Sequence, residues 1–320
     1  MSYKIEKISG DASFREFYRV QKNTKSSILV LAKKDKYKNI FTYCAINEIL
    51  NKNKILAPKV INNFKQDNII EISDLGKKSF CEFIKNKKNK IPEYKKLIEL
   101  ILKIQKIKLN NSYKFNNKII RFEKHSLKNL HKESDLFFNW YLSNKIKKKK
   151  LARIKTEIKK ELNEVYKKLY FKNIYFVHRD FHVSNIILSG KKLGLIDSQD
   201  AIIGNPLYDL ASLIDDVRVN LSKKNQDVLF RYYIQKSEFL KKDQLNLKND
   251  FDILSVQRNL KILGIFVRLL KRDGKSNYIK YLPRTWKLLE VRLKNSIFNG
   301  LKKVINKNIS IKKMKKFRFK

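Results

Sequence analysis

The stretch FVHRDFHVSNIIL, from Phe176 to Leu188, constrains this chain more than any other. Its two ends, Phe176-Val177 and Ile186-Ile187-Leu188, are short apolar runs of the kind that form strands. A hairpin needs only about two to five connecting residues, usually with glycine or asparagine. Here eight residues connect the runs, and they include two histidines, an arginine, an aspartate and an asparagine. We therefore expect this connection to be a site of chemistry.

The polar residues follow the layout that phosphoryl transfer requires. Asn185 comes five residues after Asp180, and Asp197 comes 12 residues after Asn185, at the end of the apolar run LGLI. In kinases an aspartate accepts the proton of the acceptor hydroxyl, while an asparagine and a second aspartate hold Mg²⁺ against the triphosphate. Mg²⁺ prefers hard oxygen ligands, and a loop followed by a strand and a turn can direct two of them at one point. The pattern predicts a phosphotransferase with Asp180 as base and with Asn185 and Asp197 as metal ligands.

The chain changes its character near residue 73. Before that point, short segments rich in β-branched and aromatic residues alternate with polar turns, and only residues 39–53 have a helical period. After it, helical patterns dominate at roughly 77–109, 124–144, 147–170 and 207–300. The sequence predicts an α+β fold with a small β-rich lobe followed by a larger, mainly helical lobe. The predicted parts are an N-terminal nucleotide lobe at 1–73, a hinge at 74–76, a catalytic and substrate lobe at 77–300, and a basic C-terminal tail at 301–320.

The net charge of +44 arises from 74 Lys and Arg residues against 30 Asp and Glu residues. Such an excess can indicate a nucleic-acid binder. However, the basic residues are spread over the whole chain, and Asn and Ile are abundant beside only eight glycines, as AT-rich codon usage would give. We therefore expect no nucleic-acid partner, and we keep a non-catalytic basic binding module as the alternative from another class. A field of this sign would attract anionic ligands, including nucleotides.

The expected location is the cytoplasm. No apolar run approaches the roughly 18 residues of a membrane span, and the N-terminal residues MSYKIEKISGDASF lack the apolar stretch of a signal peptide. Cys44 and Cys81 form neither a metal-ligand pattern nor a disulfide framework, so we expect reduced structural thiols. The sequence gives no indication of oligomeric state.

A family resemblance follows from these motifs. VHRDFHVSNIIL together with LGLIDSQDAIIGNPLYDLASLIDD resembles the catalytic core of the aminoglycoside phosphotransferase and choline kinase superfamily, which shares the protein-kinase fold. GDASFREFYRV, ISDLG, SDLFFNWYL and QRNLKILGIFVRLLKRDGK narrow the resemblance to the bacterial anomeric kinases of N-acetylmuramate and N-acetylglucosamine. It implies a two-lobed protein-kinase-like fold. It also implies transfer of the γ-phosphoryl of ATP, with Mg²⁺, to the anomeric hydroxyl of one of these sugars in cell-wall recycling.

The alternative within enzymes is a kinase of the same fold that acts on an aminoglycoside, choline or another alcohol. Nothing in the sequence chooses between the two sugars. For the catalytic loop, the resemblance implies that His178 braces the segment that carries Asp180. For the hinge, it implies that the backbone of Ser73, Asp74 and Leu75 binds the adenine edge.

The phosphate-binding residues are less clearly marked. No G-x-G-x-x-G loop is present, and Gly10 to Ser13 occupies its place. Ser13, Arg15 and Arg19 are candidate phosphate contacts, and the alternative is a tight turn with two solvent-facing arginines. The superfamily also has a strand lysine paired with a helix glutamate. Lys33 or the adjacent Lys34, with Glu48 as partner, would fit that pair, although the related sugar kinases often lack the lysine.

Two further features bear on the site. Protein kinases have Phe-Gly after the metal aspartate, whereas this chain has Ser198-Gln199, and we expect the smaller Ser198 to loosen the packing beneath the metal. Candidate sugar contacts lie further along the chain, and each has a structural alternative. The first pair is Trp140 and Tyr141. Their flat rings could stack on a pyranose ring, and the alternative is that they pack in the hydrophobic core. The second pair is Arg258 and Arg268, which suit a carboxylate or form surface ion pairs.

Overall fold

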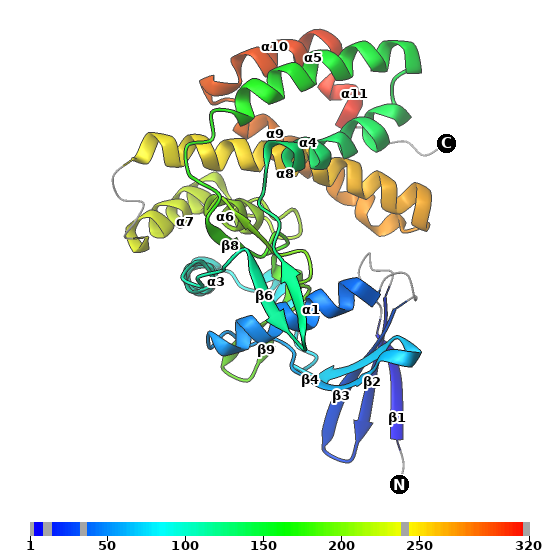
Figure 1. Ribbon diagram of the computed structural model, residues 1–320. Helices are drawn as coiled ribbons and strands as arrows, with labels where there is room; N and C mark the ends of the chain where they lie inside the picture. Colours follow the sequence, from blue (N-terminus) through cyan, green and yellow to red (C-terminus); the bar gives the residue numbers. More distant parts are fainter. Residues whose placement is uncertain (1–2, 9–14, 33–36, 238–242, 316–320) are drawn as a thin grey trace. The chain divides into compact units, whose positions relative to one another are not determined.

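The computed structural model describes residues 3–8, 15–32, 37–237 and 243–315 (Figure 1). Their contacts divide the chain into two compact units. Unit 1 comprises Met1–Glu123 and Tyr175–Ile202, and unit 2 comprises Lys124–Ile174 and Ile203–Lys320. The predicted hinge and the predicted catalytic loop therefore both belong to unit 1. The lobe boundaries at residues 73, 76 and 300 stay predictions.

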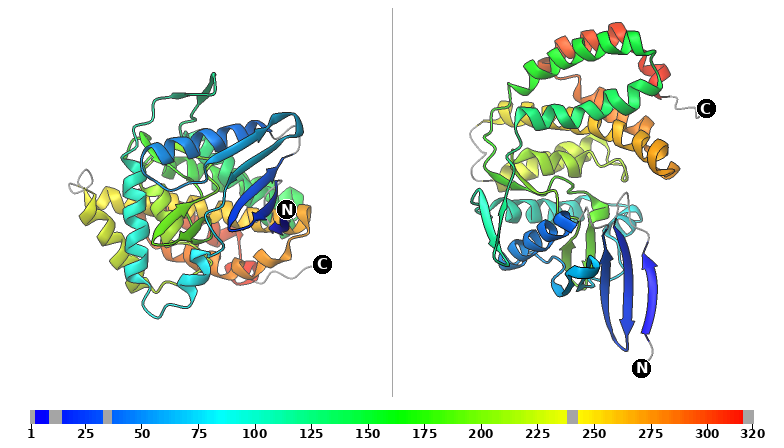
Figure 2. Two further views of the ribbon diagram at one scale, coloured as in Figure 1. Left: turned by 90° about the horizontal axis from the view of Figure 1, so that it is seen from below. Right: turned by 45° about the vertical axis from the view of Figure 1, so that its right-hand side comes forward.

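Unit 1 contains a five-stranded antiparallel sheet with the strand order β1-β2-β3-β5-β4. Its strands are β1 Tyr3–Ile8, β2 Glu16–Lys22, β3 Lys25–Leu31, β4 Val60–Phe64 and β5 Ile69–Ser73. Figure 2 shows the first three side by side in blue. Alternate residues along β3 and β5 are buried on one face, where Ile28 is the register partner of Ile72 and Val30 that of Ile70. The strands predicted in this part of the chain are confirmed. They could be predicted because the residue pattern of a strand is local to its segment.

The rest of unit 1 consists of short helices and hairpins. They are α1 Tyr37–Lys52, α2 Phe80–Lys85, α3 Ile91–Gln105, β6 Ser112–Phe115, β7 Lys118–Arg121, β8 Tyr175–Val177, β9 Ile186–Ser189 and β10 Lys192–Leu195. The helix expected over 77–109 is two helices, since Ser79 caps the first and a proline stands in the first turn of the second. The β6–β7 hairpin was not predicted. Its turn residues Asn116 and Asn117 have φ of 44° and 59°, as a primed hairpin turn requires.

The β9–β10 hairpin is tied into unit 1 at both of its strands. The amide of Leu195 donates to the carbonyl of Leu56 at 2.8 Å, just after α1. The amide of Leu188 donates to the carbonyl of Lys78 at 2.8 Å, just after the hinge. Because the catalytic loop enters β9 and Asp197 follows β10, these two bonds fix both candidate metal ligands relative to α1 and the hinge.

Unit 2 is mainly helical. Its elements are α4 Leu127–Leu136, the π-helix η3 Phe137–Tyr141, α5 Lys148–Tyr166, α6 Leu207–Ile214, α7 Lys223–Lys236, α8 Gln244–Asp273, α9 Leu282–Arg292, α10 Asn299–Asn308 and α11 Ile311–Lys315, with β11 Ile202–Gly204 at its boundary. α10 packs against α5 (Figure 1). Leu301 and Ile305 of α10 are buried, so the segment predicted as a basic tail is helical as far as Lys315 and contributes to packing. No helix in the described ranges is long and apolar enough to span a membrane.

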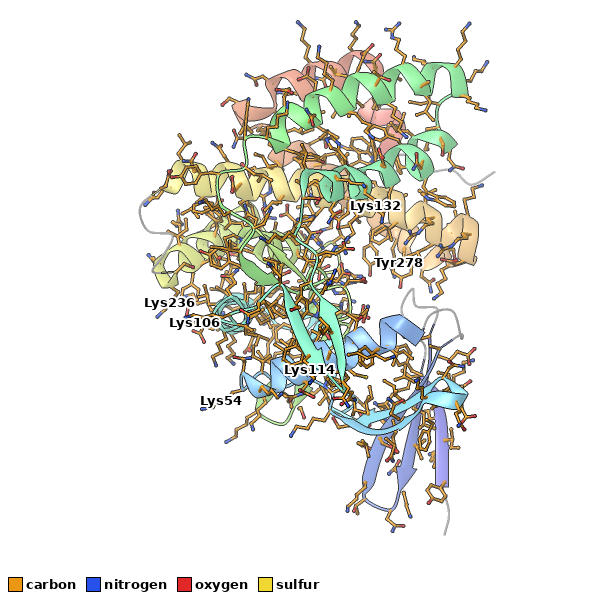
Figure 3. The ribbon with its side chains drawn as sticks, in the orientation of Figure 1. Lys54, Lys106, Lys114, Lys132, Lys236 and Tyr278 are labelled. Atoms are coloured by element: carbon orange, nitrogen blue, oxygen red, sulfur yellow. The ribbon has the colours of Figure 1, made fainter. Side chains whose placement is uncertain are left out.

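Basic side chains are distributed over both units. Lys54, Lys106, Lys114, Lys132 and Lys236 are all exposed and come from different elements (Figure 3). This distribution is what we expect if the positive charge results from the overall amino-acid composition of the chain.

The crossing of α4 and α8 in unit 2 depends on a glycine. A Cβ atom added at Gly264 would lie 2.2 Å from the carbonyl carbon of Leu136, which is backbone and cannot rotate away. We therefore expect Gly264→Ala to force α4 and α8 apart and to lower the free energy of unfolding by roughly 1–3 kcal/mol. Urea unfolding followed by circular dichroism measures this change, with exposed Lys271→Ala on the same helix as control. Equal midpoints for the two variants would contradict the close crossing.

Candidate active site

A cavity of about 270 Å³ in unit 1 brings together residues from distant parts of the chain. Seven of the predicted site residues line it: Arg15, Arg19, Ser73, Asp74, Leu75, Asn185 and Asp197. Apolar side chains from the sheet, among them Ile28 and Ile72, form part of the same lining. We call this space the nucleotide cavity.

The catalytic loop is held by hydrogen bonds to one backbone carbonyl. The carbonyl of Asp180 accepts from the His182 amide at 3.0 Å and from the Asn185 side-chain nitrogen at 2.9 Å. His178 is fully buried and meets the ring of Phe181 edge to face, with 6.1 Å between centroids. Arg179 has φ of 76°, a left-handed conformation that is strained for a residue with a side chain and that is concentrated at functional sites. The loop is therefore a fixed, strained turn around Asp180.

Asn185 and Asp197 are joined by the backbone. The amide of Ile196 donates to the carbonyl of Asn185 at 3.0 Å, which places Asp197 beside Asn185 across the hairpin. The Asn185 side-chain nitrogen is held by Asp180, so its oxygen is directed elsewhere. Asp197 has φ of 65°, a second left-handed residue in this site. One amide and one carboxylate suit Mg²⁺, which keeps several waters and takes its remaining ligands from phosphates.

Arg15 lines the nucleotide cavity beside Asp197. Its guanidinium lies 3.0 Å from Oδ1 of Asp197 and 5.6 Å from the ring centroids of both Phe17 and Tyr43. The side chain is only 11% exposed. Stacking on two aromatic rings and the ion pair with Asp197 together hold the cation in place. Arg15 therefore does not face solvent.

Arg19 stands at the hinge. Its Nε donates to Oδ2 of Asp74 at 2.6 Å and its second nitrogen to Oδ1 at 3.2 Å. Asp74 also accepts from the Ser26 hydroxyl and from the Gly76 amide. Burial by itself would raise the pKa of Asp74, but Arg19, Gly76 and Ser26 together hold it below its usual value. This forked pair fixes the conformation of the segment predicted to be the hinge, so Arg19 braces that segment.

Three further residues were predicted to contact the nucleotide or to support that contact, namely Ser13, Lys33 and Glu48. Ser13 and Lys33 lie outside the described residues. Glu48 does not line the nucleotide cavity, and its carboxylate is bound by Lys52 at 2.6 Å and by the Tyr113 hydroxyl at 2.6 Å. Lys52 lies four residues after Glu48, one turn further along α1, so this is a local pair.

The expected looseness beneath Asp197 is not observed. Ser198 is fully buried, and its hydroxyl donates to Oδ1 of Asn47 on α1 at 2.6 Å. The prediction was wrong because a small hydroxyl residue can be fixed by a hydrogen bond where a phenylalanine would be fixed by packing. The partner on α1 lies 151 residues away in the sequence, so no local pattern revealed it.

The candidate sugar residues lie in unit 2. Tyr141 is fully buried, stacks on Phe137 with 5.6 Å between centroids, and donates its hydroxyl to the Met314 carbonyl. Trp286 donates to the same hydroxyl, so Tyr141 serves the core of unit 2 and has no free face for a pyranose. Trp140, its neighbour in the π-helix η3, is half-buried.

The two arginines of α8 differ in their surroundings. Arg258 is 5% exposed, with its guanidinium 4.9 Å from the ring of Tyr208, so it is no surface ion pair. Tyr208 in turn donates to the buried carboxylate of Glu133 at 2.9 Å. Arg268 is half-buried, and desolvation lowers its pKa. Its Nε is buried without a hydrogen-bond partner among the described residues.

Several lining residues of the nucleotide cavity were not predicted. Tyr43 and Pro58 come from α1 and from the segment before β4, and Ser184 precedes Asn185. The alternation that buries Ile28 and Ile72 was a usable signal for the apolar walls, since both lie on one sheet face. For Tyr43 and Pro58 the sequence carries no such signal, because their position depends on how α1 packs.

Comparisons with known proteins identify the family of the chain. Residues 4–241 match the phosphotransferase enzyme family. The chain is 24% identical over 286 residues to N-acetylmuramate/N-acetylglucosamine kinase of Pseudomonas aeruginosa, covering 88% of this chain and 81% of that protein. It is 24% identical over 284 residues to the protein of the same name from Neisseria meningitidis serogroup B, covering 86% and 81%.

The fold is likewise similar to that of a solved choline kinase from Streptococcus pneumoniae. That structure has a TM-score of 0.61 and 14% sequence identity, and the match covers 94% of this chain and 93% of that chain. The predicted kinase-like α+β fold and the predicted enzyme class are thereby confirmed, and the alternative of a non-catalytic binding module is excluded. The chain belongs to the phosphotransferase enzyme family, as a kinase with an alcohol group as acceptor and ATP as co-substrate.

Proposed function

We propose that this kinase phosphorylates the anomeric hydroxyl of N-acetylmuramate or N-acetylglucosamine, so that cell-wall sugars can be reused. The observation that carries the proposal is the constellation around Asp180, Asn185 and Asp197 in a chain whose curated relatives have both sugars in their names. Relatives that share about a quarter of their residues fix the type of reaction more firmly than the acceptor, so the acceptor is the part that needs testing.

The proposed mechanism starts from the nucleotide. The adenine would lie against the apolar sheet face that Ile28 and Ile72 form together, with its edge at the predicted hinge. Within the described ranges the Leu75 amide has no hydrogen-bond acceptor, so we propose that it donates to the adenine ring. Arg15 lies on the phosphate side, beside the two metal ligands.

Asp180 is the proposed base. Its backbone carbonyl accepts two hydrogen bonds within the loop, and its carboxylate would accept the proton of the acceptor hydroxyl as that oxygen attacks the γ-phosphorus and the bond to the bridging oxygen breaks, with ADP as leaving group. Asn185 and Asp197 would hold Mg²⁺, which neutralises charge on the phosphate oxygens when bound. Arg15 adds a second positive group at the same point.

Charge favours a neutral or anionic acceptor. Kinases of aminoglycosides bind polycations, and carboxylates suit such substrates best. This chain has a net charge of +44, and the segment 257–275 contains a single acid, Asp273. Either Arg258 or Arg268 is the proposed partner of the lactyl carboxylate of N-acetylmuramate, and the half-buried Trp140 on η3 is the proposed flat contact for the sugar ring.

A panel of acceptors tests the proposal. The full-length protein is incubated with radiolabelled ATP, Mg²⁺ and one acceptor from a set of hexosamines, N-acetylhexosamines, choline, ethanolamine and kanamycin. We expect efficient labelling of N-acetylmuramate, N-acetylglucosamine or both, with at least tenfold lower kcat/KM for the cationic acceptors, which is about 1.4 kcal/mol of discrimination. Efficient labelling of kanamycin or choline alone would overturn the assigned acceptor and would leave the kinase fold in place.

A further inference from the structure

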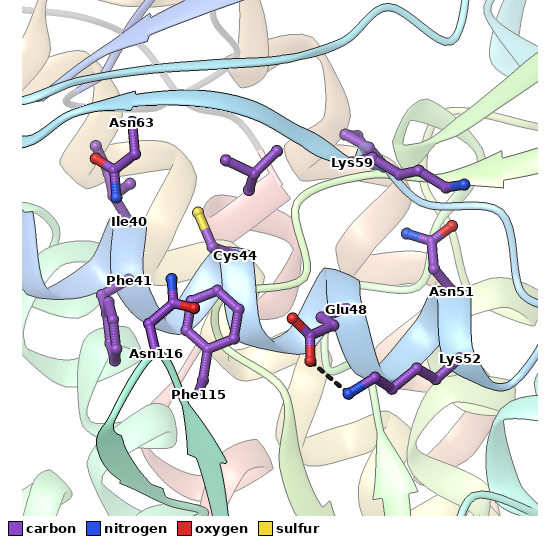
Figure 4. Close-up of a pocket in the computed structure, with 12 residues that line it drawn as sticks. Ile40, Phe41, Cys44, Glu48, Asn51, Lys52, Lys59, Asn63, Phe115 and Asn116 are labelled. Atoms are coloured by element: carbon purple, nitrogen blue, oxygen red, sulfur yellow. Dashed lines mark hydrogen bonds and ion pairs between the residues drawn. The ribbon is translucent and has the colours of Figure 1, made fainter.

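Unit 1 contains a second cavity that the proposed reaction does not use. It has a volume of about 500 Å³, within the range of small-molecule sites. Its lining comes from α1, from the start of β4 and from the β6–β7 turn: Ile40, Phe41, Cys44, Glu48, Asn51, Lys52, Pro58, Lys59, Val60, Asn63, Phe115 and Asn116 (Figure 4). We call it the α1 cavity.

Helix α1 forms a wall of both cavities. Ile40, Cys44 and Glu48 are spaced four residues apart and face the α1 cavity, as helical periodicity predicts. Tyr43 lines the nucleotide cavity and Asn47 is bonded to Ser198, so these two residues lie on an adjacent face of the same helix. Pro58 lines both cavities.

The α1 cavity has one apolar part and one polar part. The rings of Phe41 and Phe115 meet edge to face at 5.1 Å between centroids, and the Cys44 sulfur points into the space beside them (Figure 4). Burial raises the pKa of the Cys44 thiol to about 12, so this surface is uncharged at neutral pH. A ligand for this part therefore needs an apolar body.

The polar part contains an available cation. Glu48 is neutralised by Lys52, which it binds at 2.6 Å. Lys59 lies at the same end of the cavity as Asn51 (Figure 4) and forms no ion pair with any carboxylate of the described residues. Its amide is fixed by the Ser73 hydroxyl at 2.8 Å, so the side chain starts from a defined point. A ligand for this part needs an anionic group.

We propose that the α1 cavity binds a small amphipathic anion and that this binding is coupled to nucleotide binding through α1. The apolar body lies against Phe41, Phe115 and Val60, and the anionic group lies at Lys59.

The coupling route is a short series of contacts in unit 1. Asn47, one turn from Cys44, accepts the hydrogen bond of Ser198, and Ser198 directly follows the metal ligand Asp197. Tyr43 supports the guanidinium of Arg15, which in turn binds Asp197. A ligand that moves α1 by a fraction of an ångström therefore shifts both Ser198, the next residue in the chain, and Arg15, the ion-pair partner of Asp197. Coupling of this kind is reciprocal, so each ligand must change the affinity of the other by the same factor.

The first experiment measures binding of the anion 8-anilinonaphthalene-1-sulfonate by fluorescence, with saturating ADP and Mg²⁺ present so that the nucleotide cavity is occupied. Val60→Trp places a large ring in the α1 cavity, whereas Ile61→Trp adds the same ring to the same exposed strand at a position that does not line the cavity. We expect Val60→Trp to weaken probe binding by roughly tenfold or more and Ile61→Trp to leave it within about twofold. Equal affinities in the two variants would show that the probe binds elsewhere, and the proposed site would be wrong.

The second experiment tests the anionic group. N-phenyl-1-naphthylamine has the same apolar body without the sulfonate. Lys59→Ala should weaken binding of the sulfonate several-fold and leave binding of the neutral amine unchanged, whereas Lys65→Ala, outside the cavity, should change neither. If Lys59→Ala weakened the binding of both probes, or of neither, the proposal that the anionic group lies at Lys59 would be wrong.

The third experiment tests coupling. Calorimetric titration of ADP with Mg²⁺ is done without and with the saturating sulfonate probe, in the wild-type chain and in Val60→Trp. In the wild type we expect the probe to change the affinity for ADP several-fold. In the reverse titration, ADP should change the affinity for the probe by the same factor. In Val60→Trp the probe should leave the affinity for ADP unchanged. A factor of one in the wild type, or complete competitive displacement of the probe by ADP, would overturn the coupling. None of these outcomes depends on which acceptor the enzyme phosphorylates.

Discussion

Replacing Asp180 with asparagine should lower kcat by roughly 10²–10⁴ and leave nucleotide binding unchanged. The carboxylate is the proposed proton acceptor, and asparagine has the same shape but accepts no proton at neutral pH. The loop should survive the change, because the His182 amide and the Asn185 side chain both donate to the backbone carbonyl of Asp180, which the substitution leaves in place. The loss should therefore appear in turnover alone.

Steady-state turnover and calorimetric ADP titration on the same preparation separate these effects. Asp67→Asn, in the short 3₁₀ turn between β4 and β5, is the matched control, since it removes an exposed carboxylate of unit 1 far from the catalytic loop in sequence. Near-normal turnover of Asp180→Asn would show that Asp180 is not the base. A parallel loss of ADP affinity would show that its side chain holds the loop.

Replacing Asp197 with alanine should abolish the Mg²⁺ dependence of nucleotide binding and lower kcat by roughly 10²–10³. A hard cation loses its only carboxylate in the proposed set, since Asn185 supplies an amide oxygen. The same change releases Arg15, whose guanidinium lies 3.0 Å from the lost carboxylate. We therefore expect Mg²⁺-free ADP to bind this variant at least as tightly as it binds the wild type.

The measurement is a set of ADP titrations with Mg²⁺ and with a chelator, again with Asp67→Asn as control. The expected result has two parts. The affinity for ADP should no longer depend on Mg²⁺, and the affinity for metal-free ADP should be unchanged or higher than in the wild type. If the variant still gains affinity on addition of Mg²⁺ as the wild type does, then Asp197 is not a metal ligand.

The sequence could predict what depends on local pattern. Alternation of buried residues in β3 and β5 specified the strands, and the spacing from Asp180 to Asn185 and Asp197 specified the kinase loop. Asparagines at 116 and 117 were also a local signal, since both adopt positive φ in the β6–β7 turn, and this hairpin was missed.

The sequence could not predict which distant side chains meet. Arg15 and Arg19 looked equivalent, yet one binds Asp197 and the other braces Asp74 in the hinge. Tyr141 and Trp140 are neighbours in η3, and only the fold shows that Tyr141 is enclosed by Phe137 and Trp286. These assignments depend on the packing of whole helices, which no window of residues contains.

Phosphorus NMR of the purified product tests the central claim most directly. The full-length enzyme is incubated with ATP, Mg²⁺ and N-acetylglucosamine or N-acetylmuramate, and the coupling between phosphorus and the sugar protons identifies the phosphorylated oxygen. We predict coupling to the anomeric proton, in a product that no longer reduces alkaline copper because its anomeric carbon is blocked. Coupling to the protons at carbon 6, in a product that still reduces copper, would contradict the proposed reaction.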